Sequence, residues 1–252
     1  MTYLAVWLIS TGLCDLFRAR RDVVSRRDVA LISAAAVCVL VVLAVVCGVT
    51  SGGGWLLLVL SAVGLVLWVV GSAAALNRQG SRGGQVDRRL AHGALLGTTL
   101  VLLAASGRVS VAGSLVGRWY DGLGIAALGD VPVDTFLLGA GLLLFQISSA
   151  NIVVRMVLDG VGTPAASAEQ TLRGGRLLGP LERLFILGLG MAGYVTAASI
   201  VIAAKGLLRY PELREQVSSG RETGQHRGEV SEYFLVGSFV SWLLAMVGLP
   251  LL

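Results

Sequence analysis

Polar side chains interrupt an apolar stretch near residue 150. Four of them follow one another at intervals of three or four residues: Ser148, Asn151, Arg155 and Asp159. This spacing predicts that they share one face of a helix. Polar groups at membrane depth are costly unless they face protein or water, so we expect this face to point into a helix bundle. It could line an anionic path with Arg155 as the charged contact. The simpler interpretation, which we favour, is interhelical hydrogen bonding, with Arg155 pairing with Asp159 or reaching lipid headgroups.

A basic, glycine-rich segment follows at residues 172–183. Its charged residues are Arg173, Arg176, Glu182 and Arg183. Pro180 followed by Glu182 is typical of a helix start, where a carboxylate complements the exposed amide groups. The two glycines and the neighbouring arginines could instead bind a phosphate. The segment lacks the strand and the Lys-Ser/Thr pair of a nucleotide-binding loop, so we place phosphate or headgroup binding behind helix capping.

A third polar group comes directly after the apolar run 184–204. It contains Lys205, Arg209 and Glu212, with Pro211 ending or bending the helix. Basic residues at a helix C-terminus are favoured by the helix dipole and can reach the membrane interface. The alternative is a salt link from this group to Glu182 or Asp159.

These three groups suggest a function because charges at the ends of apolar spans need partners. We expect them to converge on one cavity that admits an anionic solute or a lipid headgroup, which predicts a transporter-like role. A non-catalytic membrane scaffold or anchoring protein is the alternative, in which the same charges are satisfied pairwise without a cavity. A lipid-modifying intramembrane enzyme ranks third, because no pair of carboxylates has a diagnostic spacing.

Motifs for catalysis and cofactor binding are not found in the sequence. His92 and His226 have no partners at metal-ligand spacing. Residues 188–193 match the letters of a dinucleotide-binding turn, but they lie within an apolar run with no preceding strand, so we interpret them as a helix-packing face. We therefore predict no catalytic residue, no metal and no cofactor, and we lean towards a protein that is not an enzyme.

The composition indicates a membrane protein. Apolar residues make up 55% of the 252 residues and charged residues 14%, compared with about 25% charged residues in soluble domains. The net charge is +5, but the basic residues occur in short blocks between apolar runs. This pattern offers no folded basic face for a nucleic acid. Anionic lipid headgroups are the expected partner.

Apolar runs close to 20 residues predict the membrane spans. Five of them are clear: residues 29–49, 55–76, 135–154, 184–204 and 233–252. Residues 90–107 form a shorter candidate, and residues 1–14 either cross the membrane or lie along its surface. We thus expect an all-α, polytopic transmembrane bundle of six or seven spans. It forms one integral membrane domain over 1–252, with N-terminal helices in 1–108 and C-terminal helices in 131–252.

The basic residues predict the orientation of the spans. Arginines cluster in 18–27 and again in 78–89, whereas the glycine-rich turn at 50–54 has none. Both basic segments should face the cytoplasm. The alternation fails near the C-terminus, where 205–231 carries five basic residues on the side that it makes external. A re-entrant or crossing element within 109–130 would repair the alternation, and the sequence leaves this open.

The last third of the chain resembles a family of uncharacterised bacterial polytopic membrane proteins. The resemblance rests on Leu172-Arg173-Gly174-Gly175-Arg176, Gly179-Pro180-Leu181-Glu182-Arg183, Ala203-Ala204-Lys205, Arg209-Tyr210-Pro211-Glu212 and Glu232-Tyr233-Phe234-Leu235-Val236-Gly237. It implies a multi-pass protein of the bacterial inner membrane and transfers no activity. A membrane-protein partner or a homo-oligomer is compatible with this interpretation.

Overall fold

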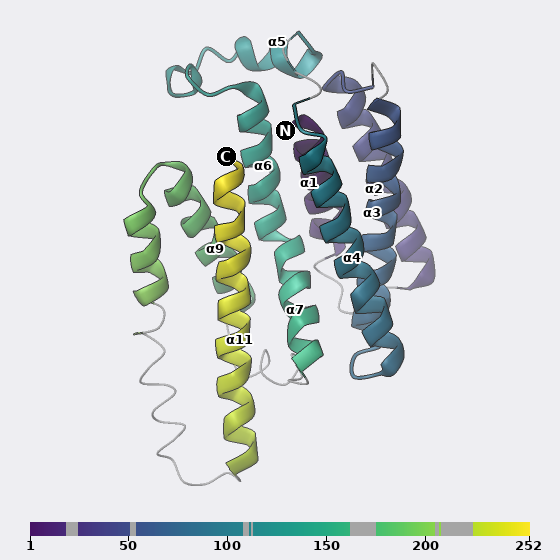
Figure 1. The fold of residues 1–252 in the computed structure, drawn as a ribbon, viewed down its shortest axis with the longest axis vertical. Helices are drawn as coiled ribbons and strands as arrows, with labels where there is room; N and C mark the ends of the chain where they lie inside the picture. Colours follow the sequence, from purple (N-terminus) through teal and green to yellow (C-terminus); the bar gives the residue numbers. More distant parts are fainter. Residues whose placement is uncertain are drawn as a thin grey trace. The chain divides into compact units, whose positions relative to one another are not determined.

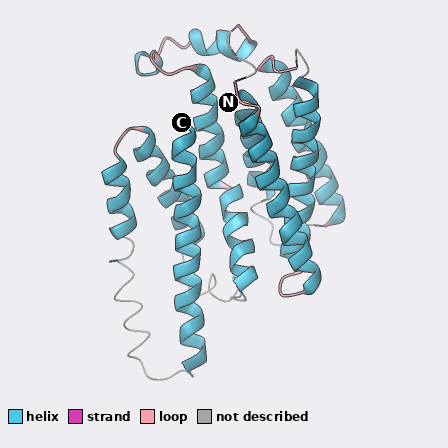
Figure 2. Cartoon of the chain, in the orientation of Figure 1, coloured by secondary structure: helices cyan, strands magenta, loops and turns pink. Residues whose placement is uncertain are grey.

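The chain folds into two helical units. The computed structural model describes residues 1–18, 25–50, 54–107, 111, 113–161, 175–204, 207 and 224–252, with backbone alone at 127, 175–177 and 224–234. All regular secondary structure within these ranges is helical, which confirms the all-α class (Figure 2). The two compact units are Met1–Ser149 and Ala150–Leu252.

The first unit is built around its N-terminal helix. Its elements are α1 (Thr2–Arg18), α2 (Arg26–Val46), α3 (Gly54–Asn77), α4 (Arg82–Ala104), α5 (Leu115–Asp121), η1 (Ala126–Leu128) and α6 (Val133–Ile147) (Figure 1). Helix α1 contacts α2, α3, α4 and α6. It is buried along almost its whole length, including its polar residues. The segment that the sequence left as either a span or a surface helix is therefore the central helix of this unit.

Hydrogen bonds fix the start of α1 to two neighbouring elements. The hydroxyl group of Thr2 donates to Asp134 Oδ1 at 2.9 Å, close to the start of α6. The hydroxyl group of Tyr3 donates to the carbonyl oxygen of Val49 at 2.9 Å, just beyond the end of α2. The beginning of α1 thus lies at the same end of the unit as the end of α2 and the start of α6.

Glycines let α1 and α6 approach closely. A Cβ atom on Gly12 would lie 2.9 Å from the backbone carbon of Leu144, and one on Gly141 would lie 3.1 Å from the carbonyl oxygen of Ala5. Such close backbone contact is typical of helix pairs in membranes, where small residues allow tight packing.

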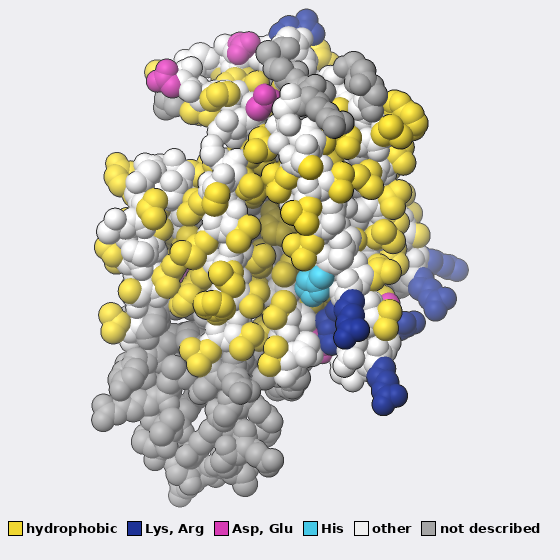
Figure 3. Space-filling model, viewed as in Figure 1, with side chains coloured by type: hydrophobic (Ala, Val, Ile, Leu, Met, Phe, Trp, Pro, Cys, Tyr) yellow, Lys and Arg dark blue, Asp and Glu magenta, His cyan; other side chains and the backbone are white. Residues whose placement is uncertain are grey.

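Among the residues that the structure describes, two helices are long and apolar enough to cross a membrane: α2 and α3. Helices α6 and α7 (Ser149–Val161) pass the same test when taken together, as either one broken span or a re-entrant loop. The structure thus supports two or three spans by length and composition and does not confirm six or seven. Exposed apolar residues cover α2 and α3, whereas basic side chains gather beyond them, at the end of α3 and the start of α4 (Figure 3).

Helix α5 is too short to cross a membrane. Its seven residues rise about 10 Å, one third of a hydrocarbon core. The hydroxyl group of Tyr120 donates to the carbonyl oxygens of Leu128 and Val131, at 3.3 and 2.8 Å, and so folds the following segment back onto α5. Within the described part of 109–130, no helix is long enough to cross a membrane.

The second unit contains α7, α9 (Gly175–Met191), the helix Val195–Ala204, α11 (Gly224–Gly248) and η2 (Leu249–Leu251). The prediction of one continuous span over 184–204 is wrong. Helix α9 ends at Met191, and Gly193 has a φ of 82°, a conformation that glycine adopts without a Cβ penalty. The amide of Tyr194 donates to the carbonyl oxygen of Leu189 at 2.8 Å, which closes the helix end.

The chain then turns back on itself (Figure 1). Ile186 of α9, Ala198 of the following helix and Ala245 of α11 form one buried cluster. A Cβ atom on Gly190 would touch the side chain of Leu249, just beyond the end of α11. The tip of this hairpin therefore lies beside the C-terminal end of α11.

Candidate functional site

The second unit buries an arginine between three helices. The Arg183 side chain of α9 is 1% exposed. Its Nη1 donates to Ser241 Oγ of α11 at 2.8 Å. Its Nη2 donates to Asn151 Oδ1 of α7. We call Asn151, Arg183 and Ser241 the Arg183 cluster.

The packing of the helices brings these three side chains together. A Cβ atom on Gly237 would lie 3.5 Å from Leu158 Cδ1, so α7 and α11 are in contact one turn away from the cluster. Arg183 lies midway between the first and last residues of α9, about 12 Å from each at 1.5 Å per residue. The two hydrogen bonds hold the planar guanidinium group in one orientation between α7 and α11.

Pro180 and Glu182 do not begin a helix, contrary to the prediction from the sequence. Helix α9 begins at Gly175, has no acidic residue in its first turn and contains Pro180 in its interior. Proline has no N–H group to donate to the carbonyl four residues earlier, so the helix continues here with one bond fewer. Glu182 is buried, at 8% exposure, instead of capping exposed amides.

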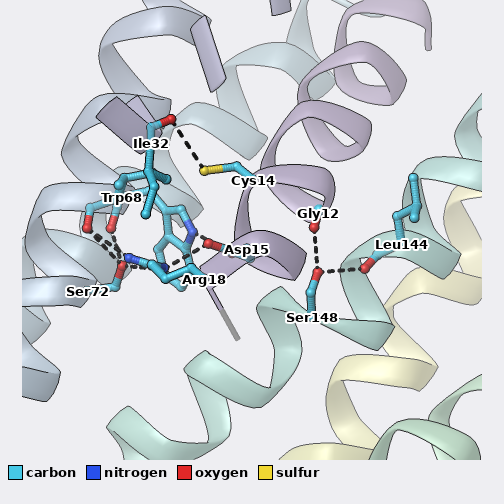
Figure 4. Close-up of polar contacts among 10 residues, drawn as sticks. Gly12, Cys14, Asp15, Arg18, Ile32, Trp68, Ser72, Leu144 and Ser148 are labelled. Carbon is cyan, nitrogen blue, oxygen red and sulfur yellow. Dashed lines mark hydrogen bonds and ion pairs between the residues drawn. The ribbon is translucent and has the colours of Figure 1, made fainter. Parts of the chain in front are cut away.

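Ser148 does not belong to the Arg183 cluster. Helix α6 ends at Ile147 and α7 begins at Ser149, so the helix face expected from residue 148 onwards is interrupted at its first member. The Ser148 hydroxyl group lies 2.7 Å from the carbonyl oxygen of Gly12 in α1 and 2.9 Å from that of Leu144 (Figure 4). It therefore connects α1 to α6 within the first unit.

The other predicted site residues lie in different parts of the chain. Asn151, Arg155 and Asp159 all lie in α7, spaced by four residues and half-buried, and so share one face. Arg176 lies in α9, where the structure describes only its backbone. The remaining four lie outside the described residues: Arg173, Lys205, Arg209 and Glu212. Of the predicted set, the structure brings Asn151 and Arg183 into contact.

The first unit contains a buried ion pair that the sequence analysis missed. Asp15 and Arg18 of α1 are 0% and 3% exposed. Arg18 Nη2 lies 2.8 Å from Asp15 Oδ1. Both side chains lie in the interior of the unit, beside α3 (Figure 4).

Helix α3 supplies the remaining partners of this pair. Trp68 Nε1 donates to Asp15 Oδ2 at 2.9 Å. Arg18 donates to Ser72 Oγ and to the carbonyl oxygen of Val69, both at 2.9 Å. The Ser72 hydroxyl group in turn donates to the carbonyl oxygen of Trp68. We call Asp15, Arg18, Trp68 and Ser72 the Asp15–Arg18 network.

The hydrogen bonds of the network offset part of the cost of burying two charges. A buried ion pair contributes little unless further hydrogen bonds satisfy the remaining donors and acceptors. Here both carboxylate oxygens and both terminal guanidinium nitrogens have partners. Arg18 Nε is buried without one. The network therefore fixes α1 against α3, and its contacts are internal to the unit.

A weak signal for this network does exist in the sequence. Asp15 and Arg18 are one helical turn apart, as are Trp68 and Ser72 within the apolar run 55–76. A tryptophan and a serine one turn apart give an otherwise apolar helix a polar edge. The sequence cannot show that this edge faces the charged pair.

The comparisons add no known relative. Comparison of the chain with protein-family models, curated proteins and solved structures finds no match. Within the described ranges, no group of three or more His, Cys, Asp or Glu side chains is placed to hold a metal ion. The Arg183 cluster and the Asp15–Arg18 network are therefore the basis for a functional interpretation.

Proposed function

We propose that this chain is a multi-pass protein of the bacterial inner membrane with a transporter-like role. In this proposal the Arg183 cluster binds an anionic group, carried either by a small solute or by a lipid headgroup. One observation carries the proposal: Arg183 is buried midway along α9 and is oriented by oxygens from two other helices.

The proposal follows from the cost of an arginine at membrane depth. On insertion scales, an arginine at the centre of a membrane helix costs about 2.5–3.5 kcal/mol. Arginines retained at such positions face the bundle interior and mark pathways for ions or substrates. Transporter sites lie near the membrane midplane, which is where the midpoint of a crossing helix would place Arg183. A guanidinium fork matches the geometry of carboxylate and phosphate groups.

The orientation of the first unit supports the multi-pass part of the proposal. The basic residues at the end of α3 and the start of α4 mark the cytoplasmic side, and the glycine-rich turn between α2 and α3 marks the external side. Thr2 and Tyr3 bond to residues at the external ends of α6 and α2. Helix α1 would accordingly run from the external to the cytoplasmic side.

A membrane scaffold is the second candidate. The Asp15–Arg18 network favours it, because the contacts of these charges connect helices of the same unit. In a scaffold the Arg183 cluster would likewise connect α7, α9 and α11, and an added anion would not affect it. The two candidates thus differ in whether Arg183 responds to a ligand.

Thermal unfolding of the purified protein in nanodiscs separates these candidates. One arm adds inorganic phosphate, or malonate as a carboxylate, to nanodiscs of zwitterionic lipid. The other arm replaces part of that lipid with phosphatidylglycerol. A ligand that binds the folded state raises the melting temperature, and the rise grows with the ratio of the ligand concentration to its dissociation constant. We expect a rise in one arm, which identifies either a solute or a headgroup as the source of the anion.

Substitutions show whether a rise in melting temperature comes from binding at the Arg183 cluster. Arg183→Gln removes the charge and should abolish the rise. Arg118→Gln removes an exposed arginine of the first unit and should leave it unchanged. If Arg183→Gln does not fold, Ser241→Ala replaces it. This variant keeps the charge but removes one oxygen that orients the guanidinium group, so it should reduce the rise in melting temperature. A stable protein with no rise in either arm, or a rise that survives Arg183→Gln, would favour the scaffold.

A further inference from the structure

The turn at Gly193 bears on the membrane topology of the second unit. The charge alternation assumed one crossing over 184–204, and it therefore placed the five basic residues of 205–231 outside. The structure has two helices there, α9 and Val195–Ala204, which pack against each other through Ile186 and Ala198. A hairpin returns the chain to the side from which it came.

The direction of each helix follows from contacts within the unit. Arg183 bonds to Ser241, and Gly190 lies against Leu249, so α9 and α11 run parallel. Asn151 of α7 lies beside Ser241 of α11, because both bond to Arg183. Leu158, further along α7, lies beside Gly237, which comes earlier in α11. Helix α7 is therefore antiparallel to α11. Val195–Ala204 is antiparallel to α9, because the chain reverses at Gly193.

The charges lie at one end of this arrangement. The turn between the two helices, residues 192–194, has no charged residue, and neither does the rest of 184–204. Apart from Arg183 in the middle of α9, the basic residues of 172–231 lie near the start of α9 or after Ala204: Arg173, Arg176, Lys205, Arg209, Arg214, Arg221 and Arg227. All of them belong to segments that adjoin the opposite end of the hairpin from Gly193. By the positive-inside rule, that end is cytoplasmic.

We infer that α9 and the helix beginning at Val195 form a membrane hairpin that the chain enters and leaves on the cytoplasmic side, with its Gly193 turn directed towards the external side. The segment between Ala204 and Gly224 is then cytoplasmic, and the charge alternation holds along the whole chain. Glu182 and Arg183 then lie midway along the first helix of this hairpin rather than at its entrance. This inference rests on the membrane location in the proposed function, but not on the anion site.

Cysteine labelling from the two sides of the membrane tests the inference in the full chain. The native thiols of Cys14 and Cys47 are buried, whereas that of Cys38 is exposed on apolar α2, so the labelling of the unmodified protein is measured first as the blank. Two positions report on the hairpin: Tyr194→Cys, whose tyrosine is 64% exposed at the turn, and Ser218→Cys. Thr223→Cys is a second reporter for the segment of Ser218. Gln79→Cys and Ala126→Cys, both at exposed positions, mark the cytoplasmic and external sides of the first unit.

A membrane-impermeant maleimide is applied to spheroplasts and to inverted vesicles. We expect Tyr194→Cys to be labelled with Ala126→Cys in spheroplasts, and Ser218→Cys and Thr223→Cys to be labelled with Gln79→Cys in inverted vesicles. Labelling of Ser218→Cys and Thr223→Cys in spheroplasts would overturn the inference. Protection of Tyr194→Cys in both preparations would overturn the external position of the turn. Labelling of Gln79→Cys and Ala126→Cys on the same side, or recovery of the protein in the soluble fraction, would instead contradict the proposed membrane location.

Discussion

Trp68 Nε1 in α3 donates a 2.9 Å hydrogen bond to Asp15 Oδ2 in α1, and both side chains are fully buried. The bond joins two helices of the first unit at a charged group that cannot reach solvent. A buried carboxylate that loses such a donor bears the full cost of its desolvation. The bond should therefore stabilise the first unit by more than a hydrogen bond between two neutral groups would.

Replacing Trp68 by Phe should destabilise the first unit. The substitution keeps an aromatic ring but removes the donor to Asp15, so we expect a loss of about 1–3 kcal/mol. Thermal unfolding in detergent, followed by size-exclusion chromatography of heated samples, measures the effect. Trp55→Phe on the same helix is the matched control, because Trp55 is 59% exposed and should change stability by no more than about 0.5 kcal/mol. Equal effects of the two substitutions would contradict the role of the bond.

Much of the fold of the first unit could be predicted from the sequence. The hairpin of α2 and α3 follows from two uncharged runs joined by a glycine-rich turn, and both helices occur within a few residues of the predicted bounds. The burial of α1 could not be predicted, because 17 residues that include Asp15 and Arg18 also fit a helix lying along the interface. Its partners come from α3, about fifty positions later, and sequence spacing carries no information about such contacts.

The second unit shows a different limit of sequence reasoning. Hydropathy is continuous over 184–204, so the break at Gly193 has no signal in composition. What reveals it is the φ of Gly193 and the bond from Tyr194 to Leu189. Asn151 and Arg183 were both candidate residues, whereas Ser241 was not, because a single serine in an apolar run usually bonds to its own helix.

The Asp15–Arg18 pair predicts strong non-additivity. Asp15→Asn or Arg18→Met alone leaves the other charge buried without its partner, so each should cost about 3–5 kcal/mol. The double substitution removes both charges and should cost clearly less than the sum of the two. Unfolding of the four proteins in detergent gives the coupling energy. Additive losses would mean that the two side chains stabilise the unit independently.

The close approach of α1 and α6 predicts the response to an added methyl group. Gly12→Ala places a Cβ atom 2.9 Å from the Leu144 backbone, which cannot move away cheaply, so we expect a loss of about 1–3 kcal/mol. Gly97→Ala in α4 is the control, since a Cβ atom there meets nothing within 4 Å. That change should be neutral or stabilising by up to about 1 kcal/mol. The same heated-sample chromatography compares them, and a stable Gly12→Ala protein would show that the helices are less tightly packed.

The turn of the proposed hairpin should be sensitive to substitution at Gly193. An alanine there must adopt a φ of 82°, and a left-handed conformation costs a residue with a Cβ atom about 1–2 kcal/mol. Gly188→Ala is the matched control in α9, because its Cβ atom has open space and the helix interior favours alanine over glycine by about 0.5–1 kcal/mol. The melting temperature should therefore fall for Gly193→Ala and rise for Gly188→Ala. If Gly193→Ala is as stable as Gly188→Ala, the chain does not need the left-handed turn, and a continuous helix over 184–204 becomes the better description of this segment.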